Sequence, residues 1–99
     1  MELTSARAEE PQPKFQLGKI VVTRHALNTL EHEDMVAALA RHIVGDWGDL
    51  DEHDRAQNEA ALVERTRLLS SYQSASGIKF WIITEANRSV TTVLLPEDY

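Results

Sequence analysis

The densest group of chemically capable side chains is in residues 45–54, which read Gly-Asp-Trp-Gly-Asp-Leu-Asp-Glu-His-Asp. Carboxylates at this density are suited to a divalent cation or to a basic protein surface. The two glycines supply backbone freedom, and the Trp and Leu are apolar anchors that a plain solvated loop does not need. We therefore expect a shaped acidic turn between two helices that binds a protein partner with a basic surface. The residues expected to bind this partner are Asp46, Trp47, Asp49, Asp51, Glu52 and Asp54.

These acids do not follow the pattern of a metal site. A calcium loop alternates oxygen ligands, turns at a glycine and ends on a bidentate glutamate. Residues 49–51 begin such a pattern, but residues 53–54 do not continue it. The simpler alternative is that the acids cap a helix and coat its solvated face. The four histidines also lack the spacing of a zinc site. We expect no metal or other cofactor, and we expect surface histidines near helix ends at His25, His32, His42 and His53.

A second group of basic and acid–base side chains, most of them on the predicted antiparallel sheet, suits RNA cleavage without a metal. Toxin nucleases often place residues of these types on such a sheet. The reaction needs a base for the 2′-hydroxyl, an acid for the leaving oxygen and a cation for the phosphate. The simpler interpretation is that these are exposed strand and turn residues, and a net charge of −6 would repel RNA. A metal-independent ribonuclease is therefore the alternative function. Its catalytic candidates are His25, Lys79, Glu85 and Arg88.

The composition is that of a folded, acidic protein of 99 residues, with 42% apolar residues and 10 basic against 16 acidic side chains. This charge argues against direct nucleic-acid binding, which relies on Lys and Arg against phosphate. The absence of cysteine excludes disulfides and thiolate chemistry. There is no signal-peptide pattern, and no apolar run approaches the roughly 20 residues that span a membrane. A cytoplasmic location without membrane association is expected.

The elements that must position these side chains begin after a polar stretch. Residues 1–14 are expected to form a flexible tail, and residues 15–99 a single domain. The pattern predicts a strand over 15–22, bent at Gly18, and helices over 24–30, 33–44 and 51–64. Thr23, Asp49 or Asp51, and Gly45 are the expected helix boundaries. The apolar faces expected to be buried are Met35, Val36, Leu39, Ala40 and Ile43 in one helix, and Ala56, Ala60, Ala61 and Val63 in the next.

From residue 67 the period changes to two, which predicts strands over 67–73, 78–85 and 89–95. The short turns between them require antiparallel neighbours. Trp81 and Ile83 are apolar on the face opposite Phe80 and Ile82, so the middle strand is expected to be central. The N-terminal strand, the tail or a second subunit would then cover the other face, which makes a homodimer one expectation. The predicted class is α+β, with two to three helices followed by a three-stranded antiparallel meander.

The runs 81–89 (Trp-Ile-Ile-Thr-Glu-Ala-Asn-Arg-Ser), 94–99 (Leu-Leu-Pro-Glu-Asp-Tyr) and 45–49, together with Asn58, carry a resemblance. They resemble a family of short bacterial proteins encoded on plasmids and integrated elements, some labelled plasmid-related or as a type I restriction subunit. The resemblance extends from about residue 15 to 99. It implies a mobile-element setting but no chemistry and no functional residues. The leading hypothesis is thus a non-enzymatic accessory protein that binds a basic partner, one form being an inhibitor of a host defence nuclease.

Overall fold

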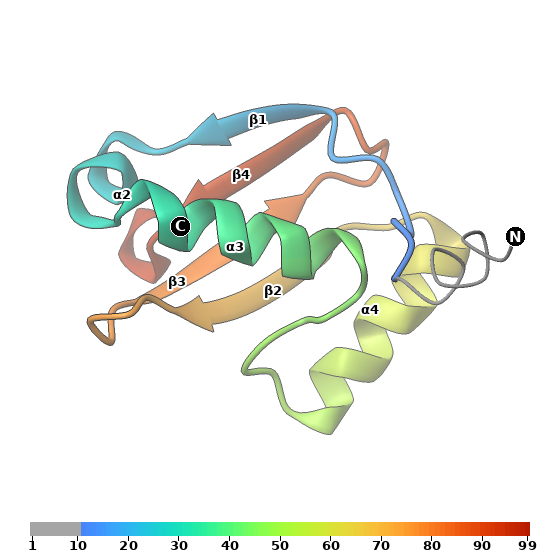
Figure 1. The fold of residues 1–99 in the computed structure, drawn as a ribbon. Helices are drawn as coiled ribbons and strands as arrows, with labels where there is room; N and C mark the ends of the chain where they lie inside the picture. The colour runs from blue at the N-terminus through green and yellow to red at the C-terminus, as the bar shows by residue number, and fades with distance from the viewer. Residues whose placement is uncertain (1–10) are drawn as a thin grey trace, which may run out of the picture.

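The computed structural model describes residues 11–99, so the prediction of a flexible tail over residues 1–14 lies for the most part outside the described residues. Within the described part, the Lys14 N–H donates to the Ile43 carbonyl. The chain forms three helices and four strands and ends in a short 3-10 helix (Figure 1). The predicted α+β class is therefore confirmed. In chain order the elements are β1 (Lys19–Val22), α2 (Arg24–Thr29), α3 (His32–Ile43), α4 (Glu52–Glu64), β2 (Leu68–Gln73), β3 (Lys79–Thr84), β4 (Val90–Leu94) and η1 (Pro96–Asp98).

The strands form one mixed sheet in the order β1-β4-β3-β2. The predicted antiparallel meander is present, with Ser70 opposite Ile82 and Ile82 opposite Val93. The expectation of a three-stranded sheet was incomplete, because β1 pairs with β4 in parallel and places Val22 opposite Val93. Two parallel neighbouring strands must be joined by a long crossover connection. The connection from β1 to β4 contains all three helices. The N-terminal strand thus extends the sheet at its edge.

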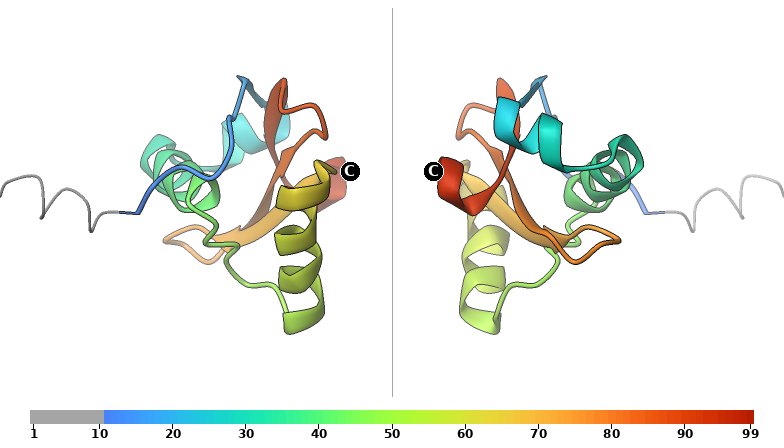
Figure 2. Two further views of the ribbon diagram at one scale, coloured as in Figure 1. Left: turned by 90° about the vertical axis from the view of Figure 1, so that its right-hand side faces the viewer. Right: turned by 90° about the vertical axis from the view of Figure 1, so that its left-hand side faces the viewer.

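Helices lie on both faces of the sheet (Figure 2). Helices α2 and α3 cover one face, and α4 with η1 lies on the other. The main core fills the space between the sheet and α2–α3, where burial of apolar side chains supplies most of the driving force for folding. Its fully buried members are Ala26, Leu30, Met35, Ala38, Tyr72, Phe80, Ile82, Val93 and Leu95.

The helix boundaries follow local signals in the sequence. The Thr23 hydroxyl accepts a hydrogen bond from the Ala26 N–H at the start of α2, and Asp51 accepts one from the Asp54 N–H at the start of α4. Gly45, at the end of α3, has a φ of +84°, the left-handed conformation that glycine adopts without steric cost. These three predicted boundaries are confirmed.

The buried helix faces differ from those predicted. In α3 the buried residues are Met35, Ala38 and His42, whereas Val36 is 50% exposed and Ala40 is exposed. In α4 only Asn58 and Ala61 are buried. The expected apolar residues Ala56, Ala60 and Val63 of α4 all face solvent. Each helix offers more than one row of apolar residues, and the row that packs depends on where the sheet lies.

The second face of the sheet is covered within the chain around its central strand. Ile83 is only 3% exposed, and the Trp81 ring makes an edge contact with Tyr99 at 5.9 Å between centroids. The Tyr99 hydroxyl accepts a hydrogen bond of 2.8 Å from Arg67 Nη1. Helix α4 and the residues that follow β4 therefore cover this face. The expectation from the sequence was that the N-terminal strand, the tail or a second subunit would do so.

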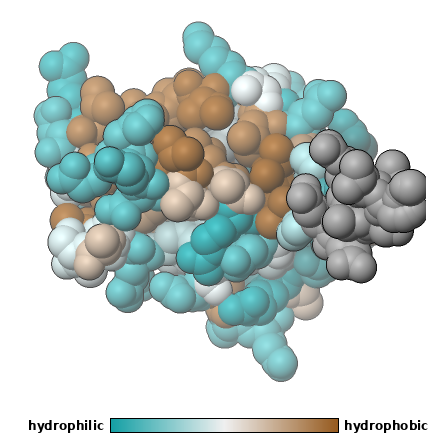
Figure 3. Space-filling view, viewed as in Figure 1, coloured by the Kyte–Doolittle hydropathy of each residue, from teal (hydrophilic) through white to brown (hydrophobic). Residues whose placement is uncertain are grey.

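Apolar side chains are exposed mainly near β1. Figure 3 shows hydrophobic residues gathered in the upper part of the view, where β1 and α3 lie. Those from β1, α2 and α3 are Ile20, Val21, Leu27 and Val36, with exposed fractions from 37% to 60%. Over residues 11–99, none of the helices combines the length and apolar character required to span a bilayer.

Candidate functional site

The connection between α3 and α4 is anchored by Trp47, which is 2% exposed. Its ring stacks on Phe15 at 6.3 Å and meets the His42 ring edge-on at 5.8 Å. The indole N–H donates a 2.9 Å hydrogen bond to Glu59 in α4. Trp47 is therefore a core residue that anchors the acidic segment to the interior of the protein. Its ring is buried and is not presented to a partner.

The same connection is hydrogen-bonded to β2. The Asp49 N–H donates to the Ser71 carbonyl at 2.7 Å, and the Ser71 N–H donates to the Trp47 carbonyl at 3.2 Å. Gly48 lies between them with a φ of +75°, and a Cβ there would come within 2.0 Å of the Ser71 oxygen. Arg55 closes the loop by donating to the Leu50 and Gly48 carbonyls. The acidic segment is thus held as rigidly as an edge strand.

Three of the six residues predicted to bind a partner, the buried Trp47 and two of the acids, are used by the fold itself. Asp46 forms an ion pair of 2.8 Å with Arg41 and also accepts a hydrogen bond from the Gly48 N–H. The hydrogen bond from Arg41 is the main reason why the pKa of Asp46 lies below its usual value. Asp51 caps α4. With Trp47 in the core, these residues set the shape of the segment.

The other three, Asp49, Glu52 and Asp54, are exposed. Their carboxylates accept no hydrogen bond and form no ion pair with another residue of the described range 11–99. They project from the loop and from the first turn of α4, whose backbone is fixed by the contacts above. Three carboxylates are therefore held in place by a rigid frame and left available to an external partner.

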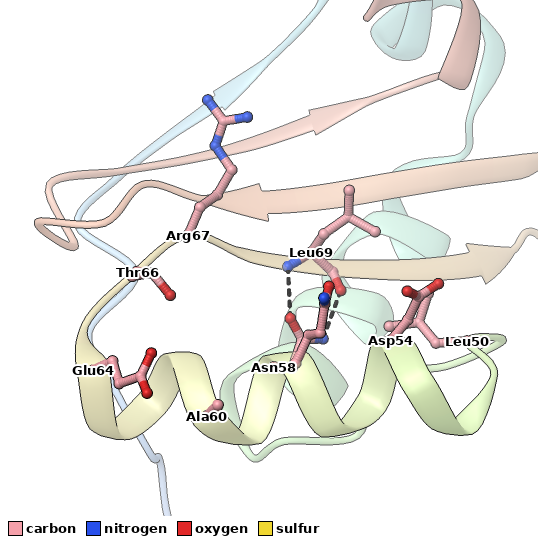
Figure 4. A pocket seen from close by; sticks show the side chains of 9 residues that line it. Leu50, Asp54, Asn58, Ala60, Glu64, Thr66, Arg67 and Leu69 are labelled. Carbon is pink, nitrogen blue, oxygen red and sulfur yellow. Dashed lines mark hydrogen bonds between the residues drawn. The ribbon is translucent and has the colours of Figure 1, made fainter.

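A groove of about 500 Å³ lies between α4 and β2, and of these three acids Asp54 lines it. Asp54 and Leu50 stand near the start of α4, and Glu64 stands near its end (Figure 4). The one cation among the described lining residues is Arg67, which binds Glu85 and Tyr99 and points away from α4. The groove therefore combines two carboxylates that lack a cationic partner in the described chain with three apolar residues, Leu50, Ala60 and Leu69.

Asn58 forms the floor of this groove and was not predicted as a functional or positioning residue. Its amide accepts from the Leu69 N–H at 3.2 Å and donates to the Leu69 carbonyl at 2.7 Å (Figure 4). The side chain thus makes the pair of bonds that a neighbouring strand would make with the edge of β2. An asparagine in the middle of a helix, a position that its side chain disfavours, is the sequence signal that could have revealed it.

A buried polar chain crosses the core on the other face of the sheet. His42, fully buried, has hydrogen bonds of 2.5 Å between Nδ1 and the Ser70 hydroxyl and 2.9 Å between Nε2 and the Thr84 hydroxyl. Thr84 is bonded to Thr91, which donates to the Leu17 carbonyl. Burial, followed by the charge of Arg88, lowers the pKa of His42 to about 4. The prediction of a surface histidine was wrong for His42, and with Ser70 also buried this pair is structural.

The four residues proposed for RNA cleavage are distributed over the molecule. His25 pairs with Asp98 at 2.9 Å beside α2. Lys79 begins β3 and Glu85 directly follows its last residue, so they lie about 20 Å apart at the rise of an extended strand. Glu85 accepts from Arg67, and Arg88 faces the end of α4, where it donates to the Ala61 carbonyl. They do not converge on one substrate position.

Within residues 11–99 there is no cluster of three or more histidine, aspartate or glutamate side chains able to hold a metal ion. Comparison of the chain with protein-family models, with curated proteins and with solved structures finds no match.

Proposed function

We propose that the protein is a non-enzymatic interaction module that binds a basic polypeptide segment along α4. The observation that carries the proposal is the pair of carboxylates that line the groove, Asp54 and Glu64, neither of which forms an ion pair with another described residue. Asp49 and Glu52 are exposed near the start of the same helix and add negative charge there. A net charge of −6 favours a partner with a basic surface. Opposite charges speed the association of two proteins and fix how they align on each other.

The geometry supports a partner that is extended and amphipathic. Leu50, Ala60 and Leu69 offer apolar contact along the groove, while Asp54 and Glu64 stand toward its two ends. Lys or Arg side chains spaced along a bound segment would meet these carboxylates while their aliphatic stems lie on the apolar wall. The rigid frame around Trp47 and Gly48 lowers the entropy cost of binding, since the acids are ordered beforehand.

The resemblance to proteins of bacterial mobile elements suggests that the partner is a protein of the bacterial host. An accessory protein of such an element has host proteins as its natural targets, and a basic nucleic-acid-binding surface of a defence nuclease is one version of the proposal. The proposed binding of a basic segment depends only on the acids and the groove. It does not require that the partner be a defence nuclease.

The test is capture of partners from a bacterial lysate with the tagged full chain, followed by mass spectrometry at low and high salt. The variant D49N/E52Q/D54N removes three carboxylates that make no hydrogen bond or ion pair with another described residue. Two of these charges lie in the first turn of a helix, and the control variant removes two first-turn charges as well. Partner affinity should fall at least tenfold, because each interfacial charge pair contributes about 1 kcal/mol or more when partly desolvated. The captured protein should be basic and should be released by salt.

The matched control is E31Q/E33Q/E97Q, which removes the same three charges from exposed acids outside the groove and the α3–α4 connection. It should retain the partner, so that a site effect is separated from a net-charge effect. Equal loss in both triple variants, or unchanged capture by the first, would contradict the proposal.

The ribonuclease alternative has no assembled site in its favour, because its four candidates are held apart by the sheet. An RNA-cleavage assay of the purified chain tests it directly. Cleavage that is abolished by Glu85→Gln would revive this alternative.

A further inference from the structure

A second pocket, of about 330 Å³, lies on the side of α4 where the helix ends. It is formed by the segment before β1, the end of α4 and the β3–β4 turn, three stretches that are far apart in the sequence. Three of its lining residues are cations, and none is acidic: Lys14, Phe15, Gln16, Leu62, Arg65, Asn87 and Arg88. A cationic pocket is unexpected in a chain with six more acids than bases.

Arg88 is a buried cation without an anionic partner in the described chain. Its side chain is only 6% exposed. It donates to the carbonyls of Thr66 and Ala61 at 2.6 and 2.9 Å, and its guanidinium lies over the Phe15 ring at 5.8 Å. No carboxylate of residues 11–99 forms an ion pair with it. Burying a charge without a counter-ion is costly, so an anion at this position would stabilise the arrangement.

One edge of the Arg88 guanidinium is left for such an anion. Nη1 donates to the carbonyls of Thr66 and Glu85, and Nη2 donates to the Ala61 carbonyl. The Nε–H makes no hydrogen bond to another described residue, and no buried side-chain nitrogen of residues 11–99 is without a partner. The Nε–H is therefore accessible from outside, and because Arg88 lines the pocket it is the donor that an oxyanion bound there would engage.

Arg65 adds a second cation in a conformation that has a steric cost. It lies at the end of α4 with φ 59° and ψ 55°, and its charge acts on Arg88 with like sign. Within residues 11–99 the non-glycine residues with positive φ are Arg65 and Arg88, and both line this pocket. Glycine is the usual residue at such positions, and strained non-glycine residues concentrate at functional sites.

We infer that this pocket binds the phosphate group of a small molecule between Arg65, Arg88 and Lys14. A phosphate dianion offers several acceptor oxygens and matches guanidinium forks better than a single carboxylate does. Asn87 adds amide donors at the rim, and the small volume fits a phosphate or a phosphate monoester. This site lies apart from the groove between α4 and β2, so it stands independently of the proposed partner.

The test uses the uniformly ¹⁵N-labelled full chain and inorganic phosphate at constant ionic strength, followed through the arginine Nε–H and backbone amide resonances. A saturable shift of the Arg88 Nε–H signal is expected, together with shifts of the Asn87 and Arg88 amides. The same titration with adenosine monophosphate distinguishes the two sources of the group. Tighter binding of the monoester identifies an esterified ligand, and tighter binding of inorganic phosphate identifies the free ion.

The matched variants are Arg65→Gln and Arg24→Gln, which each remove one exposed arginine charge. Affinity should fall at least fivefold for the first and stay unchanged for the second. Arg65→Gly is a further variant, since it removes the charge while relieving backbone strain, so loss of binding there cannot be ascribed to misfolding.

A competing explanation is that the cations serve only the C-terminal ends of α3 and α4. The end of the Lys14 side chain, Nζ included, lies over Gly45 at the end of α3, and Arg88 donates to carbonyls at the end of α4. If so, phosphate produces no saturable shift, or the two glutamine variants respond alike. Either result would overturn the inference.

Discussion

His42 is the residue through which α3 is tied to the sheet. Its ring has hydrogen-bonding partners on both nitrogens, Ser70 on β2 and Thr84 on β3, and it is packed between Phe15 and Trp47. A neutral imidazole satisfies one donor and one acceptor position. A protonated ring would place an extra donor and a charge in a site with no carboxylate, which explains why burial lowers its pKa.

The stability of the protein should therefore depend on pH through His42. The folded-state pKa is about 4, against an ordinary value of 6.5. Between these values the unfolded chain binds more protons, so the stabilisation is complete above 6.5 and is lost as pH falls toward 4. The expected loss is about 3 kcal/mol. Urea unfolding followed by tryptophan fluorescence at a series of pH values measures it.

His42→Gln should lower stability at neutral pH and flatten this part of the pH profile. His53→Gln, at an exposed position of α4, should leave the profile unchanged. A profile that keeps its slope in His42→Gln would show that another group is responsible.

At Arg65 a substitution to glycine is expected to stabilise the protein, because the natural residue occupies a strained backbone conformation. Arg65→Gly should raise the free energy of unfolding by about 1 kcal/mol relative to Arg65→Ala, since glycine adopts positive φ without a Cβ clash. Both variants lose the charge, so their difference isolates the backbone. Thermal or urea unfolding of the two proteins gives this value, and equal stability would contradict the assignment of strain.

At the scale of elements, the edge of β2 is closed by parts of the chain that are not strands. The Asn58 amide pairs with both backbone groups of Leu69, and the loop around Gly48 pairs with Ser71. An open edge strand is a template for unwanted pairing. Helix α4 contributes little apolar burial, with Ala61 as its one fully buried apolar residue, so its attachment depends strongly on these polar contacts.

Asn58→Ala should therefore lower the free energy of unfolding by about 2–3 kcal/mol, because it leaves the N–H and C=O of Leu69 without partners. Amide hydrogen exchange at Leu69 should accelerate in the folded protein. Asn58→Asp is the informative companion, since it keeps the acceptor for the N–H and loses the donor for the carbonyl. Gln57→Ala, on the exposed face, serves as control and should change stability by less than about 0.5 kcal/mol. Similar losses for Asn58→Ala and the control would contradict the role of the amide.

At the scale of the whole molecule, the two sheet faces are closed in different ways. Helices α2 and α3 cover one face with a continuous apolar core. On the other face, Tyr99 lies against Trp81 and is joined to Arg67, which also binds Glu85. Beyond the part that α4 covers, this face is closed by Tyr99, which is itself 73% exposed, so it is where a homodimer, which stays a prediction, would form.

Removing that cover tests the idea. Tyr99→Ala should cost about 1–2 kcal/mol through the aromatic contact and the hydrogen bond, and it should increase self-association measured by sedimentation. Tyr99→Phe keeps the ring and loses the hydroxyl, so it should lose less stability and stay as the wild type does in sedimentation. A Tyr99→Ala protein with unchanged mass and stability would show that the ring does not protect this face.

The sequence by itself determined most of the elements and most of their ends, although the strand predicted over 15–22 is shorter in the structure, where β1 begins at Lys19. Thr23, Gly45 and Asp51 mark helix boundaries that the structure confirms, and the three strands of the meander lie within the predicted ranges. These features depend on caps, turns and periodicity, which are interactions between residues close in the chain. The acidic segment could also be located in this way, together with Trp47 as its anchor.

Only the tertiary structure decided which faces are buried and which side chains are free. The parallel pairing of β1 with β4, the burial of His42 and Arg88, and the exposure of Val36 depend on contacts between distant segments. Local patterns carry no information on such contacts. The same holds for the acids, where Asp46 and Asp51 are used by the fold while Asp49, Glu52 and Asp54 remain unpaired in the described chain. Their sequence spacing is similar, and the difference lies in what the folded chain places beside each one.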